Sequence, residues 1–243
     1  MLHPLGIPIG VALMPKFFAA AGRFTMDWFL SASLMSGKEL GEGGEPRGGW
    51  GLAYCHGNRL EVVKSHRSRT ESAVFSQLLE LRTDMAMLYL HDPEQVLSPR
   101  LVQPFIRRES GDAWAFLYTG QIPNLTGLFS GSRYPDGPDP GEQLFMYVLD
   151  RFWQEEPVAS VNAVISRLNP DAELSFCLMS AEIMVAVCRF QDIKTSPGRL
   201  WLGKGELVRI VSSPPITQIP GVTWEPLLSN QVLVINRQRR AVI

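Results

Sequence analysis

The sequence predicts an α+β fold, a layered sandwich of antiparallel strands with a few helices. The expected elements run in the order strand, helix, hairpin, helix, two strands, two helices and a last group of strands. Several strands come as neighbours joined by turn residues, which favours antiparallel pairing. With 243 residues, 45% of them hydrophobic and 19% charged, the chain can bury a large core. We expect a single domain over residues 1–243.

The first elements are expected to be an edge strand followed by helices. Residues 5–13 are apolar and interrupted by glycine and proline, a pattern that predicts an edge strand. Over residues 17–35 the aromatic and aliphatic side chains recur at helix-like spacing. This spacing predicts two helical pieces separated at Gly22 and Thr25.

A hairpin, a helix and a strand are expected next. Residues 51–55 and 59–63 are strand-like and flank the turn His56-Gly57-Asn58, so they predict a hairpin. Residues 71–81 predict an amphipathic helix, and the compact apolar segment 85–90 predicts a strand.

The second half of the chain predicts a central strand, two helices and a hairpin. The central strand is an apolar aromatic run that ends near Gly120, where the chain can turn or be approached closely by another group. The expected elements are a strand over 113–118, helices over 144–153 and 158–168, a hairpin of 174–179 with 183–190, and strands over 207–212 and 231–235.

Charge and cysteine content exclude several classes of function. The net charge of −1 and the pI of about 6.4 provide no basic surface for nucleic acid or an anionic membrane. No apolar run approaches the roughly 20 residues of a membrane span. The cysteines Cys55, Cys177 and Cys188 are odd in number and widely spaced, which fits a reducing compartment. We therefore expect a cytoplasmic protein.

Two local arrangements invite a catalytic or metal-binding interpretation. Cys55 and His56 are adjacent in a predicted strand, so their side chains should point to opposite faces, with a half-buried thiol and a turn histidine. His91 and Asp92 could form an acid/base pair, or a metal site with Glu94, but entry into a loop is the preferred interpretation. A zinc site would need further ligands close by, so we expect no metal and no cofactor.

Basic and aromatic residues are expected to have structural roles. The basic run that contains Lys64 predicts a solvated face. Large aromatic residues predict core packing rather than ligand stacking, namely Trp114, Phe116, Trp153 and Trp201.

Several motifs follow one another in an order that resembles a known family. They are Met1-Leu2-His3-Pro4-Leu5-Gly6, Gly49-Trp50-Gly51, Gln103-Pro104-Phe105, Leu117-Tyr118-Thr119-Gly120 and Asp139-Pro140-Gly141-Glu142. Together they resemble the class II, N-terminal nucleophile type of glutamine amidotransferase. The resemblance implies a four-layer αββα sandwich of two antiparallel sheets flanked by helices.

The residues that carry the family's chemistry are replaced in this sequence. The family's nucleophile is a cysteine after the initiator methionine, where this chain has Leu2. Its oxyanion asparagine corresponds to Thr119, while the following Gly120 is kept. The aspartate that grips the substrate's α-amino group corresponds to Pro140, and the arginine for its carboxylate corresponds to His91. The family's His-Pro-Phe begins here with Gln103.

The resemblance and these losses together predict a pseudoenzyme. We expect no catalytic residues, doubtful binding of glutamine, and a role as a structural or regulatory subunit with a protein partner or in a homo-oligomer. Two alternatives remain open at this point. One is a hydrolase of altered chemistry that uses the same pocket, and the other is a small-molecule sensor that binds without turnover.

Overall fold

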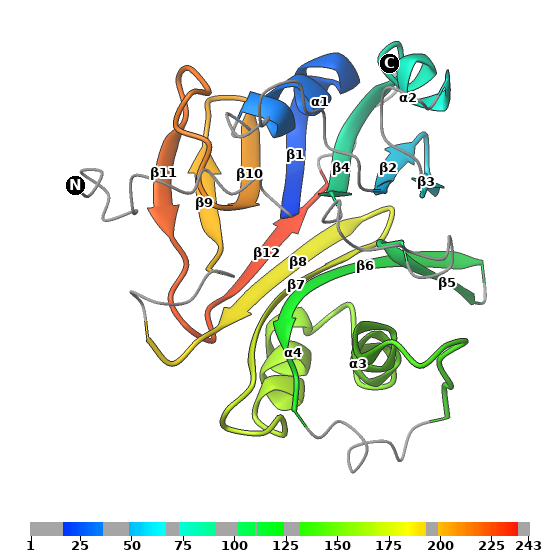
Figure 1. Ribbon diagram of the computed structural model, residues 1–243, viewed down its shortest axis with the longest axis vertical. Helices are drawn as coiled ribbons and strands as arrows, with labels where there is room; N and C mark the ends of the chain where they lie inside the picture. The colour runs from blue at the N-terminus through cyan, green and yellow to red at the C-terminus, as the bar shows by residue number, and fades with distance from the viewer. Residues whose placement is uncertain are drawn as a thin grey trace.

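The computed structural model describes residues 17–35, 49–66, 73–90, 102–109, 111–123, 132–192 and 199–237. Two sheets pack face to face, and helices lie on the outer side of each (Figure 1). The helices are α1 (Met26–Met35), α2 (Ala73–Leu78), α3 (Pro140–Leu149) and α4 (Pro157–Ile165). Helices α1 and α2 cover one sheet, and α3 and α4 cover the other (Figure 1). The expected αββα sandwich is therefore confirmed.

Each sheet is antiparallel throughout the part that the structure describes. The first sheet has the order β11-β9-β10-β1-β4-β2-β3 and the second the order β12-β8-β7-β6-β5. The strands of the first sheet are β1 (Phe17–Thr25), β2 (Trp50–His56), β3 (Arg59–Ser65), β4 (Arg82–Leu90), β9 (Trp201–Lys204), β10 (Val208–Ser213) and β11 (Thr223–Pro226). Those of the second are β5 (Phe105–Glu109), β6 (Asp112–Gln121), β7 (Glu173–Met179), β8 (Ile183–Arg189) and β12 (Val232–Asn236).

The prediction of two helical pieces over residues 17–35 is wrong for its first half. This half forms β1, which lies between β10 and β4 in the middle of its sheet. A central strand is buried on both faces, so its run of apolar residues has no period that distinguishes strand from helix. Thr25 does mark a boundary, because its hydroxyl accepts a hydrogen bond from the Trp28 amide (3.2 Å) at the start of α1.

The predicted hairpins form, whereas several short strands went unpredicted. Strand β2 pairs with β3 and β7 pairs with β8, as expected. The unpredicted strands β5, β9 and β11 have only four or five residues each, too few to show an alternating pattern. The expected helix over residues 71–81 is limited to α2, and the edge strand expected over 5–13 lies outside the described residues.

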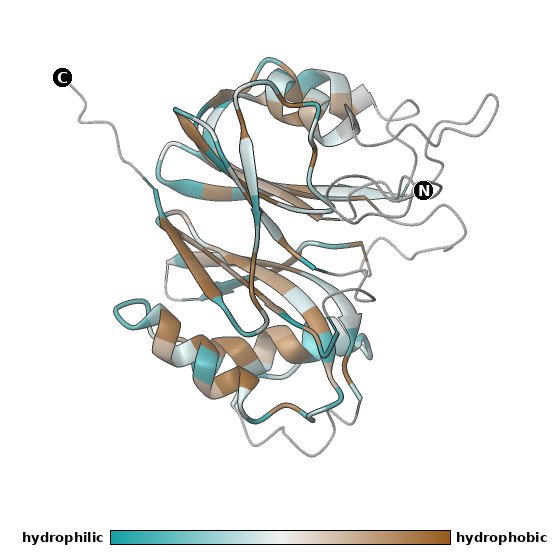
Figure 2. Ribbon diagram, turned by 90° about the vertical axis from the view of Figure 1, so that its left-hand side faces the viewer, coloured by the Kyte–Doolittle hydropathy of each residue, from teal (hydrophilic) through white to brown (hydrophobic). Residues whose placement is uncertain are grey.

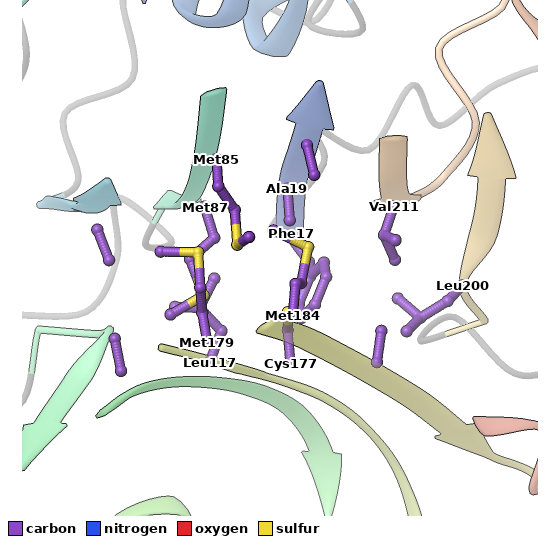
Figure 3. Packing of buried hydrophobic residues seen from close by; sticks show 14 of the residues in the cluster. Phe17, Ala19, Met85, Met87, Leu117, Cys177, Met179, Met184, Leu200 and Val211 are labelled. Carbon is purple, nitrogen blue, oxygen red and sulfur yellow. The ribbon is translucent and has the colours of Figure 1, made fainter. Parts of the chain in front are cut away.

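Methionine, cysteine and alanine fill the space between the two sheets. Met85 and Met87 from β4 meet Met179 and Met184 from the opposite sheet, and all four are fully buried (Figure 3). Hydrophobic residues run along the strands of both sheets and along the helices packed on them (Figure 2). One predicted core residue is misplaced, because Trp153 is 70% exposed after α3.

None of the helices seen in the described part of the chain is long and apolar enough to cross a membrane. Within the same residues, no group of three or more His, Cys, Asp or Glu side chains is arranged to hold a metal ion.

Candidate functional site

The end of β6 and the start of α3 meet at Tyr118. Its backbone amide donates to the side-chain oxygen of Gln103 (2.7 Å), which continues the bonding of β6 beyond the last β5 pair at Phe105. Its hydroxyl is hydrogen-bonded to the Asp139 carboxylate. The ring lies so close to Gly141 that a β-carbon there would be 1.7 Å from Tyr118 Cε1. Tyr118 thus joins the second sheet to the first turn of the helix.

The surroundings of Tyr118 keep its phenol neutral. Burial raises the pKa of Tyr118 well above its ordinary value of 10.0, and the negative charge of Asp139 raises it further. Phe105 stacks beside the ring, with centroids 6.5 Å apart. Tyr118 is therefore a protonated hydrogen-bond donor over the physiological pH range.

Asp139 and Pro140 occupy the N-terminus of α3. The Asp139 carboxylate accepts from the Gly141 amide (2.7 Å) and, more weakly, from the Glu142 amide (3.4 Å). Pro140 is the exposed first residue of the helix and has no N–H to offer. The amides that could bind an anion at this helix start are therefore already bonded within the chain.

Thr119 and Gly120 lie at the end of β6 beside β7. Thr119 is half-buried and pairs in register with Ser175. Gly120 has φ of +114°, and a β-carbon there would be 2.2 Å from the Glu173 carbonyl oxygen. Only glycine allows this approach of the neighbouring strand, as the sequence suggested for this position.

The structure brings four of the six predicted pocket positions into one region. Tyr118 is bonded to Gln103, contacts Asp139 and Gly141 on either side of Pro140, and directly precedes Thr119 and Gly120 in the chain. Leu2 and His91, together with Asp92 and Glu94 beside His91, lie outside the described residues.

All three cysteines are buried in strands of the inner core. Cys55, Cys177 and Cys188 are each at most 1% exposed, and none is in a disulfide. Burial raises the pKa of each thiol, to about 12 for Cys55. Cys55 is thus more deeply buried than expected, while the adjacent His56 is exposed on the other face. None of these thiols has the low pKa or the exposure of a nucleophile.

The contacts of Tyr118, Asp139 and Lys64 were not predicted from the sequence. Lys64 was expected on a solvated face but is half-buried in β3. It has the same strand parity as Leu60 and Val62, which pack against the inner core, and that parity was the available signal. The contact of Tyr118 with Asp139 joins distant parts of the chain and leaves no local signal.

Comparison with known proteins agrees with this architecture. Residues 14–197 match the family model described as glutamine amidotransferases class-II. None of the curated proteins matches the sequence. The chain also resembles the glutamine phosphoribosylpyrophosphate amidotransferase from B. subtilis, with a TM-score of 0.69 and 18% identity over 90% of this chain and 47% of that one. The chain therefore spans about half the length of that enzyme.

Two solved structures of comparable length have the same fold. A glutamine aminotransferase class-II domain protein from Silicibacter pomeroyi matches with a TM-score of 0.62 and 14% identity, over 90% of this chain and 94% of that one. A predicted glutamine amidotransferase from Pseudomonas aeruginosa matches with a TM-score of 0.55 and 14% identity, over 90% of this chain and 92% of that one.

Proposed function

Because the chain belongs to the class II glutamine amidotransferase family, we propose that it is a member that no longer hydrolyses glutamine. In this proposal it works as a structural or regulatory subunit of a protein complex in the cytoplasm. The observation that carries the proposal is the location of its three thiols. The chemistry that the family resemblance implies needs a reactive cysteine, and every cysteine of this sequence is buried in the inner core with a raised pKa.

The residues around the predicted pocket support the same proposal. Thr119 has no amide N–H₂ with which to replace the oxyanion donor of the family, and the loss of one such donor typically lowers the rate about a hundred- to a thousand-fold. Pro140 has no charge to hold a substrate ammonium group. Asp139, its neighbour, is already bonded to Tyr118 and to the start of α3.

The role as a subunit is supported by one of the similar enzymes, which is longer than this chain. In the B. subtilis amidotransferase, the region that resembles this chain makes up about half of a longer polypeptide. In that enzyme, a domain of this fold is therefore joined to further protein sequence in the same polypeptide. We propose that this chain likewise works with a partner, in its case as a domain without glutamine chemistry.

The state of the protein in its native cells tests the subunit role. A tagged copy expressed from its own locus should elute from size-exclusion chromatography as a complex of defined stoichiometry, with a mass above that of the 27.1 kDa chain. A monomer that releases ammonia from glutamine would contradict the proposal. A melting temperature raised by glutamine, with no ammonia released, would instead favour the sensor.

A further inference from the structure

Helix α4 has no charged residue on any side, although one of its sides faces solvent. Val161, Val164 and Ile165 are buried in the core that α4 shares with the second sheet. The helix lies on the outside of that sheet (Figure 1). Its exposed residues on the outer side are Val158, Ala159, Asn162 and Ala163. A helix that is mainly apolar on all sides is usually covered by protein on all sides.

Trp153 adds a large apolar side chain at the start of this helix. Its backbone amide donates to the Ser160 hydroxyl (3.0 Å), which places residue 153 beside the first turns of α4. Trp153 is nevertheless 70% exposed, and Val158 is 46% exposed. Tryptophan is enriched at protein–protein contacts, whose centres are poor in charged residues. The α4 surface is defined here as Trp153, Val158, Ala159, Asn162 and Ala163.

Opposite charges lie at the two ends of the α4 surface. Glu155 and Glu156 are exposed directly before the helix, and Arg167 is exposed just after it. The Asp171 carboxylate, farther along the chain, already accepts a hydrogen bond from the Gln191 side chain (3.3 Å). The surface is therefore negative at its start, uncharged in its middle and positive at its end.

This distribution of charge fits a second copy of the same chain. In a two-fold symmetric contact both partners use the same surface, so two α4 helices that meet across the axis run in opposite directions. The negative start of each helix then faces the positive end of the other. We propose that the chain forms a homodimer in which two α4 surfaces pack against each other, with Trp153 buried in the contact and Glu155 of each copy beside Arg167 of the other.

The homodimer specifies a partner for the proposed subunit role, and in that sense it rests on the proposed function. The two can still fail separately. The subunit role is tested by the complex found in native cells, whereas the homodimer is tested with the purified chain alone.

Sedimentation velocity of the purified full chain tests the homodimer. A surface made of one short helix and one tryptophan is at the small end of protein interfaces, so we expect a Kd on the order of 10 μM. In a series up to about twenty times that Kd, the wild type should approach twice the 27.1 kDa of one chain.

Val158→Arg should weaken the dimer about ten-fold or more, because it removes an apolar contact and adds a positive charge near Arg167 of the other copy. Leu207→Arg is the matched control and should dimerise as the wild type does. Leu207 is likewise an exposed aliphatic residue, at 53%, but it lies between β9 and β10 of the first sheet. Circular dichroism verifies that both variants are folded.

A charge exchange tests the antiparallel arrangement. Arg167→Glu should weaken the dimer about ten-fold, because it places like charges opposite each other. Adding Glu155→Arg to the same chain should restore the affinity, since each new arginine then faces a new glutamate.

The proposal would be refuted by a wild-type chain that stays monomeric at the highest concentration, a result that depends on no variant. It would also be refuted if Leu207→Arg weakened the dimer as much as Val158→Arg, or if the double charge variant bound no more tightly than Arg167→Glu. A chain that is monomeric when purified, but whose native complex is lost in Val158→Arg, would show that a different protein occupies the α4 surface.

Discussion

At the scale of single residues, the Tyr118 ring packs against Gly141 where the end of β6 meets the start of α3. The ring occupies the space that a side chain at position 141 would need. Its hydroxyl is bonded to Asp139, so the ring cannot move aside without losing that bond. Tyr118, Asp139 and Gly141 are thus held by contacts with one another. These contacts leave fewer polar groups free to bind a substrate.

Gly141→Ala is expected to destabilise the protein by about 1–3 kcal/mol, the usual cost of an overpacked site. In a Tyr118→Ala background the same change should be neutral or stabilising, because alanine favours the helix over glycine. Urea unfolding of the two single variants and the double variant measures this coupling. Equal effects of Gly141→Ala in both backgrounds would show that the Tyr118 ring does not occupy this space.

At the scale of elements, Arg133 attaches the segment before α3 to two neighbours. It forms ion pairs with Glu109 of β5 at 2.8 Å and with Asp150 after α3 at 2.7 Å. Arg107 also pairs with Glu109, at 3.0 Å. Burial alone would raise the pKa of Glu109, but the hydrogen bonds and charges of Arg133 and Arg107 lower it below its ordinary 4.5.

Arg133→Ala should lower the free energy of unfolding by about 1–3 kcal/mol near neutral pH, between the values for exposed and buried ion pairs. A carboxyl with a lowered folded-state pKa stabilises the protein above its ordinary pKa. That contribution is lost as the pH falls below 4.5. The difference between variant and wild type should therefore shrink in acid, as followed by urea unfolding at several pH values.

Arg108→Ala is the control for this element. Arg108 lies on β5 beside Glu109, its side chain is 61% exposed, and its ion pair with Glu61 has a nitrogen–oxygen distance of 3.8 Å. This substitution should change stability by less than about 1 kcal/mol. An effect of Arg133→Ala as small as that of Arg108→Ala, or one that does not change with pH, would contradict the role given to Arg133.

At the scale of the whole molecule, the sandwich encloses every thiol of the sequence. Ellman's reagent should therefore react very slowly with the folded protein and quickly with all 3 thiols after unfolding in guanidinium. Serine variants of each cysteine would identify any thiol that reacts early. A thiol that reacts at once in the folded state would remove the main support for the loss of chemistry.

The sequence predicted the layers of the molecule better than the contacts of the site. Hairpins with clear turn residues, such as β2–β3 and β7–β8, were predictable because their signal is local. Strand β1 was not, because a central strand buried on both faces has no polar period. The contact of Tyr118 with Asp139 and the burial of Lys64 depend on how separate elements pack, so the sequence alone did not reveal them.

The loss of glutamine hydrolysis can be tested by a glutaminase assay on the purified full chain. We expect no release of ammonia from glutamine above the buffer rate at any pH where the protein is folded. Release of ammonia by the wild type that disappears in Thr119→Ala, with the folded state of that variant verified by circular dichroism, would contradict it.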